Sequence, residues 1–111
     1  MDIKSIIEEQ KAFFRTGSTK SVKFRKTMLR ELAIAIRNNE DAINDAMMQD
    51  MNKAPMEVYM TETGLVLEEI RYHMKNIDSW MRNKRVRTPL TQFPAKSFRS
   101  PEPIGRVLLM A

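Results

Sequence analysis

Apolar residues recur at helical spacing through the first eighty residues of the chain. The pattern predicts a first amphipathic helix that follows Asp2, a good N-cap residue, and ends at Gly17. A second helix is expected to end at the Asn38-Asn39 pair. The acidic residues that come next favour the N-terminus of a third helix, which should run to about Asn52.

The third and fourth helices differ in how much apolar surface they present. We expect the third to bury Ile43, Met47 and Met51. The fourth and longest should begin at Pro55, because a proline in the first turn loses no intrahelical hydrogen bond. Its apolar face is wide, so it either forms plain core or partly contacts another domain or subunit. That face comprises Tyr59, Thr63, Val66, Ile70, His73 and Ile77, with Met60, Leu67, Met74 and Met81 beside them.

From Trp80 onward the helical periodicity disappears. Four of the five prolines arrive here, at positions 89, 94, 101 and 103. Proline donates no backbone hydrogen bond and pushes the residue before it toward extended geometry, so we expect an exposed, extended arm. Within it, residues 95–100 alternate in the way expected of an edge strand, and residues 101–105 should turn the chain.

The last residues read as a strand. The apolar run Val107-Leu108-Leu109-Met110 follows a turn at Gly105, which is typical of a strand buried on both faces of a parallel sheet. A parallel strand needs a crossover helix and a neighbour. We therefore expect the chain to be the front end of a larger protein, with residues 1–81 as a helical layer and residues 82–111 as a basic arm leading into a truncated domain.

Composition is that of a globular protein. The 111 residues are 42% hydrophobic and 30% charged, enough for one modest domain. No apolar run is long enough to cross a bilayer, and the first residues do not resemble a signal peptide, so a cytoplasmic protein without membrane contact is expected.

The basic charge is concentrated at one end. Residues 1–81 carry 12 Lys or Arg against 13 Asp or Glu, whereas residues 82–111 carry seven basic residues against Glu102 alone. Such a spread-out tail, with Phe93 and Phe98 as its only aromatic pair, is weak evidence for binding nucleic acid. A solvated arm, or one matched to an acidic partner surface, explains it better.

Candidate chemistry is sparse. The chain has no cysteine, so thiol nucleophiles and thiolate metal sites are excluded. His73 is most simply a packed or half-exposed residue. The adjacent pairs Glu8-Glu9 and Glu68-Glu69 diverge by about 100° around a helix and cannot face each other. Asp41 and Asp45 make at best a loose cation site. With three glycines in all, no phosphate-binding loop is present, and we predict no catalytic, cofactor-binding or metal residue.

The order of several short motifs strongly resembles the N-terminus of aldehyde dehydrogenases, in particular the class 3, fatty-aldehyde and coniferyl-aldehyde branch. The motifs are Phe14-Arg15-Thr16-Gly17-Ser18-Thr19, Phe24-Arg25, Val66-Leu67-Glu68-Glu69-Ile70, Trp80, Thr88-Pro89 and Glu102-Pro103-Ile104-Gly105-Arg106-Val107-Leu108-Leu109.

This resemblance implies a mainly α fold of about four amphipathic helices, followed by a Pro-rich arm and the first β-strands of an otherwise missing, Rossmann-like cofactor domain. The family's nucleophilic cysteine, general-base glutamate and Gly-rich cofactor turn all lie beyond the matched region. Only Ala111 is placed by the resemblance near the cofactor of a complete enzyme.

For the parent protein, the resemblance implies NAD- or NADP-dependent oxidation of an aldehyde to a carboxylic acid, through a thiohemiacetal on cysteine. The present chain would supply a scaffold, bind no cofactor itself, and contact the missing cofactor and catalytic domains and a second subunit, as homodimer or higher oligomer. The alternative is a stand-alone helical module that binds protein or nucleic acid through its basic arm.

Overall fold

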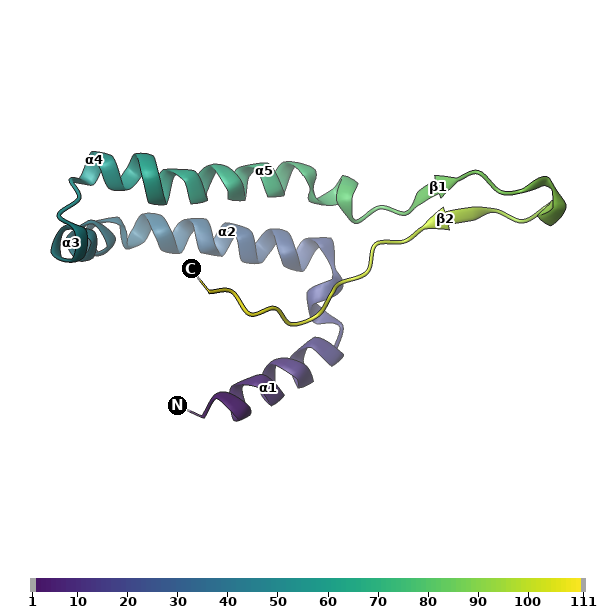
Figure 1. Cartoon of the computed structure of the whole chain (residues 1–111), viewed down its shortest axis with the longest axis horizontal. Helices are drawn as coiled ribbons and strands as arrows, with labels where there is room; N and C mark the ends of the chain where they lie inside the picture. Colours follow the sequence, from purple (N-terminus) through teal and green to yellow (C-terminus); the bar gives the residue numbers. More distant parts are fainter. Residues whose placement is uncertain (1, 111) are drawn as a thin grey trace. The chain divides into compact units, whose positions relative to one another are not determined.

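The computed structural model describes residues 2–110, which form two compact units. The helical unit comprises Arg25–Ile77, and the terminal unit combines residues 2–24 with residues 78–110. Most of the regular structure is helical, with one short two-stranded sheet, and this confirms the expected fold class (Figure 1). The division of the chain at residue 81 stays a prediction.

The first helix, α1, spans Ile3–Arg15 and begins as expected. The backbone N–H of Lys4 donates to the Asp2 carboxylate at 3.0 Å, so Asp2 caps the helix. Gly17 then takes a left-handed φ of 75°, a conformation that glycine adopts without steric cost.

The second and third helices follow with a one-residue break. α2 spans Val22–Asn38, and the N–H of Phe24 donates to Oγ of Ser21 at 2.9 Å to cap it. α3 spans Glu40–Met51 and ends where Asn52 takes a left-handed φ of 54°. The expectation that Met51 is buried is wrong, because Asn52 turns the chain directly after it and leaves its side chain 64% exposed.

The predicted fourth helix is one helical run with a wide turn inside it. α4 spans Pro55–Val58, a π-helical turn (η2) spans Tyr59–Thr63, and α5 spans Gly64–Trp80. Pro55 occupies the first turn, as expected. Within the π turn the N–H of Gly64 donates to the carbonyl of Tyr59, five residues back instead of four.

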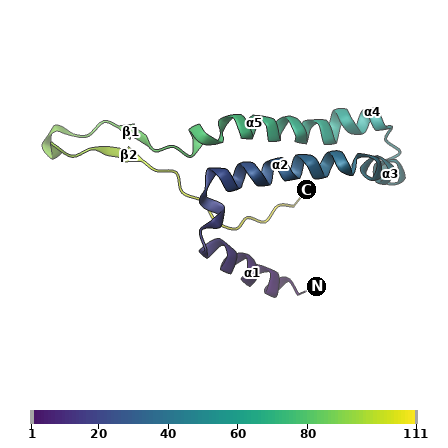
Figure 2. The ribbon, with the colours of Figure 1, turned by 180° about the vertical axis from the view of Figure 1, so that it is seen from behind.

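The core of the helical unit is narrow. α2 and α5 run side by side and antiparallel in both views (Figures 1 and 2). Of the stripe expected on the fourth helix, Thr63, Ile70 and Ile77 are buried. Val58, which an unbroken α-helical period leaves off this stripe, is the most deeply buried apolar side chain. The wider π turn accounts for this, because it places Val58 and Thr63 one turn apart.

Two strands form an antiparallel hairpin in the terminal unit. β1 spans Lys84–Val86 and β2 spans Ser97–Arg99. The register places Lys84 opposite Arg99 and Arg85 opposite Phe98. β2 lies within the predicted edge strand, whereas its partner β1 carries no alternating pattern and was not expected.

The apolar run near the C-terminal end forms no strand in the part that the structure describes. Residues 100–110 have no regular secondary structure, and the side chains from Val107 to Met110 are 76–86% exposed. A strand exists through its hydrogen-bonded neighbour, and no described segment pairs with this one. The strand is therefore not formed within the described residues, and its burial in a larger protein stays a prediction.

Gly64 gives a test of the π turn. A Cβ added at this position would meet the carbonyl oxygen of Tyr59. Gly64→Ala should therefore lower the free energy of unfolding by about 1–3 kcal/mol, although alanine favours an ordinary helix by up to ~1 kcal/mol. Urea unfolding followed by circular dichroism measures this. The exposed Ser79→Ala on the same helix is the control and should change stability by less than about 0.5 kcal/mol. A Gly64→Ala variant at least as stable as the parent would contradict the π turn.

Candidate interaction surfaces

His73 lies on the exposed side of α5. Its Nδ1 is 2.8 Å from the backbone oxygen of Glu69 and 3.6 Å from the Glu69 carboxylate. Its ring packs edge-on against Tyr72. These neighbours all lie within one turn of the same helix, and the His73 side chain is exposed.

The glutamate pair on α5 diverges, as its spacing predicts. Glu68 forms an ion pair with Arg71 at 3.1 Å, whereas Glu69 turns toward His73. Neither carboxylate is placed to act with the other as a facing acid and base.

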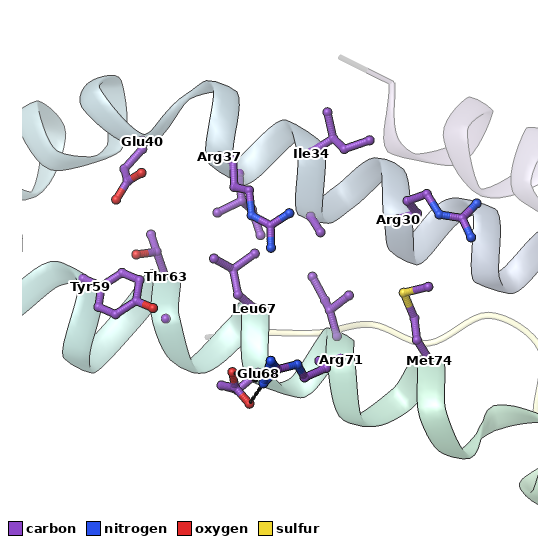
Figure 3. A pocket seen from close by; sticks show the side chains of 14 residues that line it. Arg30, Ile34, Arg37, Glu40, Tyr59, Thr63, Leu67, Glu68, Arg71 and Met74 are labelled. Carbon is purple, nitrogen blue, oxygen red and sulfur yellow. Dashed lines mark hydrogen bonds and ion pairs between the residues drawn. The ribbon is translucent and has the colours of Figure 1, made fainter.

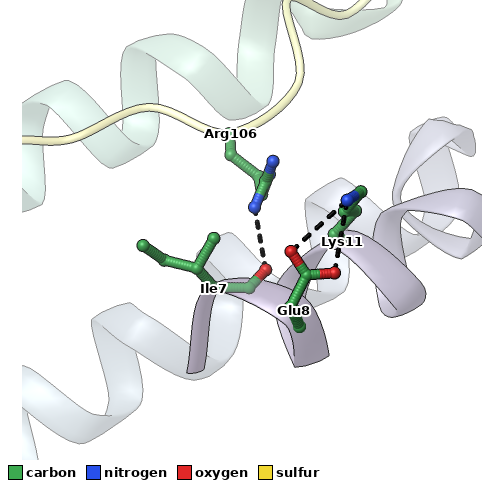
Figure 4. A network of polar contacts seen from close by, with 4 residues as sticks. All are labelled: Ile7, Glu8, Lys11 and Arg106. Carbon is green, nitrogen blue, oxygen red and sulfur yellow. Dashed lines mark hydrogen bonds and ion pairs between the residues drawn. The ribbon is translucent and has the colours of Figure 1, made fainter. Parts of the chain in front are cut away.

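The glutamate pair on α1 behaves in the same way. Glu8 forms an ion pair with Lys11 at 3.2 Å (Figure 4), and Glu9 accepts a hydrogen bond from Oγ of Ser5 at 3.2 Å. Both contacts are local to the helix surface, where such pairs contribute a few tenths of a kcal/mol.

Asp41 and Asp45 lie on α3. Across residues 2–110, no group of three or more potential metal-binding side chains is gathered. Ala111, the position that the resemblance brings near a cofactor, lies outside the described residues. The prediction that this chain holds no site residue is not tested by these observations.

The helical unit has a groove of about 720 Å³ between α2 and the run from Tyr59 to Met74 (Figure 3). Its apolar lining includes Ile34 from α2 and Leu67 and Met74 from α5. Its polar lining includes Arg30, Arg37 and Glu40 from one side and Tyr59, Glu68 and Arg71 from the other.

Arginines dominate the charge of this groove. Arg71 is paired with Glu68, but neither Arg30 nor Arg37 forms an ion pair with a described residue. The two free guanidinium groups are seven residues apart on α2, which corresponds to about 10 Å along the helix. The groove is therefore a solvated, positively charged surface rather than a dry binding cavity.

The terminal unit has a second groove of about 730 Å³, between α1 and residues 104–108. Nη1 of Arg106 donates to the backbone oxygen of Ile7 at 2.8 Å and ties the two segments together (Figure 4). Sequence reasoning missed this contact, since it joins residues 99 positions apart and follows no periodic signal.

The hairpin presents basic and apolar side chains together. Lys84 and Arg99 face each other across the strands, an arrangement that destabilises a free hairpin. Leu90 and Phe93, in the segment that joins the strands, are 90% and 84% exposed. No Asp or Glu occurs between residues 79 and 101. The hairpin therefore combines positive charge with exposed apolar side chains.

The hydroxyl groups that lie beside carboxylates or lysines in the described residues do so at the exposed surface of helices, as Ser5 does beside Glu9. The two grooves and the hairpin present charged side chains, exposed apolar side chains and the backbone of an extended segment. None of the described helices combines the length and hydropathy that a bilayer-spanning segment requires.

Comparison with known proteins gives consistent matches. The chain is 41% identical over 111 residues to 4,4'-diaponeurosporen-aldehyde dehydrogenase of Staphylococcus aureus, covering 96% of this chain and 24% of that protein. It is 31% identical over 109 residues to aldehyde dehydrogenase family 3 member F1 of Arabidopsis thaliana, covering 98% and 22%. No family model matches the chain.

A solved structure agrees. The substrate-bound state of Staphylococcus aureus AldH superposes on 93% of this chain with a TM-score of 0.88 and 39% identity, over 22% of its own length. The chain thus spans about a quarter or less of the relatives that it matches. It matches the N-terminal portion of aldehyde dehydrogenases, which confirms the resemblance drawn from its motifs.

The like-charge pair of the hairpin can be tested directly. Lys84→Glu places a carboxylate opposite Arg99 and should stabilise the hairpin by about 0.2–1 kcal/mol. Slower amide hydrogen exchange in β1 and β2 would show this. Arg82→Glu makes the same charge change just before β1, without a cross-strand partner, and is the control. Equal protection in both variants would contradict the register.

Proposed function

We propose that this chain forms the N-terminal helical layer and arm of an NAD- or NADP-dependent aldehyde dehydrogenase, which oxidises an aldehyde to a carboxylic acid. The observation that carries the proposal is the joint match in sequence and structure. Identity of 41% over 96% of the chain and a TM-score of 0.88 describe the same N-terminal region. One relative is named for 4,4'-diaponeurosporen-aldehyde and others only for their family, so the proposed substrate is defined as an aldehyde.

The role proposed for the chain itself is structural. It has no cysteine to form the thiohemiacetal, and its grooves carry contact chemistry rather than reacting groups. We assign no catalytic, cofactor-binding or metal residue to it. Residues 1–81 act as the helical layer and residues 82–111 as the arm that leads into the cofactor domain. The absence of cysteine accords with a cytoplasmic enzyme.

The arm is proposed to contact a second subunit of the parent enzyme. Leu90 and Phe93 are large, apolar and nearly fully exposed, and the basic residues around them lack local acidic partners. An interface that buries Leu90 and Phe93 and supplies carboxylates would account for the exposed apolar side chains and for the unmatched basic charge.

A complete enzyme tests the proposal. In this experiment the chain replaces the matching N-terminal segment of the Staphylococcus aureus relative, and aldehyde-dependent formation of NADH or NADPH is followed by absorbance. The chimeric enzyme should stay active, within about tenfold of the relative in kcat/KM. The isolated chain should form no reduced cofactor. Activity of the isolated chain, or an inactive chimera that is nevertheless folded, would contradict the proposal.

The second candidate function, suggested by the basic arm, is that of a stand-alone module that binds nucleic acid. A phosphate-binding surface gives retention on heparin or DNA that falls steeply as salt rises. Because the basic charge is dispersed along a hairpin and an extended segment, we expect elution from heparin at low salt. Tight retention that Arg85→Glu abolishes, and that Lys23→Glu on α2 leaves unchanged, would favour the module instead.

A further inference from the structure

The groove of the helical unit combines an apolar floor with charged edges. Ile34 of α2 is 41% exposed, and Leu67 and Met74 of α5 are half-buried. All three side chains line the groove (Figure 3). The lining on α2 extends from Arg30 to Glu40, which corresponds to about 15 Å along the helix. The groove is therefore long enough, and apolar enough, to hold an extended hydrocarbon chain.

The charges of the groove are distributed unevenly along its length. Arg30 lies with Met74 at one end, whereas Glu40 lies at the other end (Figure 3). Arg71 is neutralised by Glu68, with which it forms an ion pair at 3.1 Å. Among residues 2–110, no carboxylate forms an ion pair with Arg30. The end at Arg30 is therefore the positive end of the groove, and an anion is favoured there over the end at Glu40.

Arg37 contributes mainly its hydrocarbon stem to the groove. Its side chain extends from α2 toward Leu67, in the middle of the groove (Figure 3). Arginine stems pack along apolar surfaces while the guanidinium groups stay in water. Glu40 follows Arg37 by three residues on the same helix face and offsets part of its charge. Arg37 therefore extends the apolar floor more than it extends the positive end.

A ligand has to match the apolar floor and the positive end together. A small inorganic anion would leave the floor uncovered, and a polyanion such as nucleic acid would be repelled by the carboxylates of Glu40 and Glu68. A hydrocarbon chain that ends in one carboxylate satisfies both requirements. Its head group can accept charge-assisted hydrogen bonds from a guanidinium group, and covering its chain removes hydrocarbon from water.

We infer that the groove binds a long-chain carboxylate, with the carboxylate at Arg30 and the hydrocarbon chain along Ile34, Leu67 and Met74. Carboxylic acids are the product class of the proposed aldehyde oxidation, and the link to the product rests on that proposed function. The groove volume of about 720 Å³ lies within the range of small-molecule sites. Because the groove is open to water, binding is weak, with a Kd on the order of 1 mM for a ten-carbon acid.

Methionine methyl groups report where such a ligand binds. Met74 lines the groove and Met28 does not. Decanoate is titrated, below the concentration at which it forms micelles, into the chain labelled with carbon-13 at its methionine methyl groups. In NMR spectra the Met74 methyl resonance should shift and reach saturation, whereas the Met28 resonance should stay in place. Decylamine has the same chain and the opposite charge, and it should bind about fivefold more weakly or worse.

Two matched variants test the head-group contact. Arg30→Gln removes the charge at the positive end and should weaken decanoate binding by about three- to fivefold, the loss expected for one exposed ion pair. Lys23→Gln makes the same charge change at an exposed residue of α2 outside the groove, and should leave the affinity within about twofold because salt screens that charge. Circular dichroism checks that both variants fold as the parent does.

Three results would overturn the inference. Inorganic phosphate at the same concentration would reproduce the Met74 shift if the groove were a bare anion site. Equal binding of decanoate and decylamine would show that the positive end does not select the head group. Equal losses in Arg30→Gln and Lys23→Gln would show that overall charge, and not the contact at Arg30, governs binding.

The chimeric enzyme tests the same site in a complete protein. The shift of the Met74 methyl resonance should persist there, and its loss in a folded chimera would overturn the inference because the rest of the polypeptide would then cover the groove. Formation of reduced cofactor is a separate readout. A folded chimera that binds decanoate at Met74 but oxidises no aldehyde would contradict the proposed function and support the carboxylate site.

Discussion

The helical unit depends on one narrow buried seam along the continuous run of α4, the π turn and α5, which lies beside α2 (Figure 1). Val58, Ile70 and Ile77 are its buried apolar side chains, and burying each contributes about 1.5–3 kcal/mol before the entropic cost of ordering the chain. The π turn keeps this seam continuous, since it brings Val58 into line with the stripe that begins at Thr63. Gly64 makes the turn possible by leaving the space beside the Tyr59 carbonyl empty. The π turn thus determines that Val58, at the start of the longest helical run, is buried together with Ile70 and Ile77.

A seam of this size leaves most of the apolar surface of both helices uncovered. Two antiparallel helices can bury only the strip along which they touch, and the apolar stripes here are wider than that strip. Ile34 and Leu67 line the groove, whereas Leu32 and Leu65 are exposed outside it. Arg30, Arg37 and Arg71 line the groove.

Local signals in the sequence were sufficient to predict where the helices begin and end. They were insufficient to predict the π turn and the contacts between distant segments. Asp2, Gly17 and Asn52 act through their own backbone and side chains, so the helix ends could be predicted from caps and left-handed residues. The π turn could not, because a 3.6-residue period assumes an unbroken helix. Met51 fits the apolar period of α3 but lies at its exposed end. The pairing of Lys84 with Arg99 is unfavourable on local grounds, and the contact of Arg106 with Ile7 spans 99 residues.

The final apolar run has the sequence pattern of a strand but does not form a strand in the described residues. The run from Val107 to Met110 has the composition of a buried strand, but its backbone groups pair with no described neighbour. Strand formation needs a ladder partner, whereas a helix satisfies its own backbone within each turn. Because a helix needs no such partner, the helices in the segment that matches aldehyde dehydrogenases are formed in this chain. The run from Val107 to Met110 needs a neighbouring strand before it can form a strand itself.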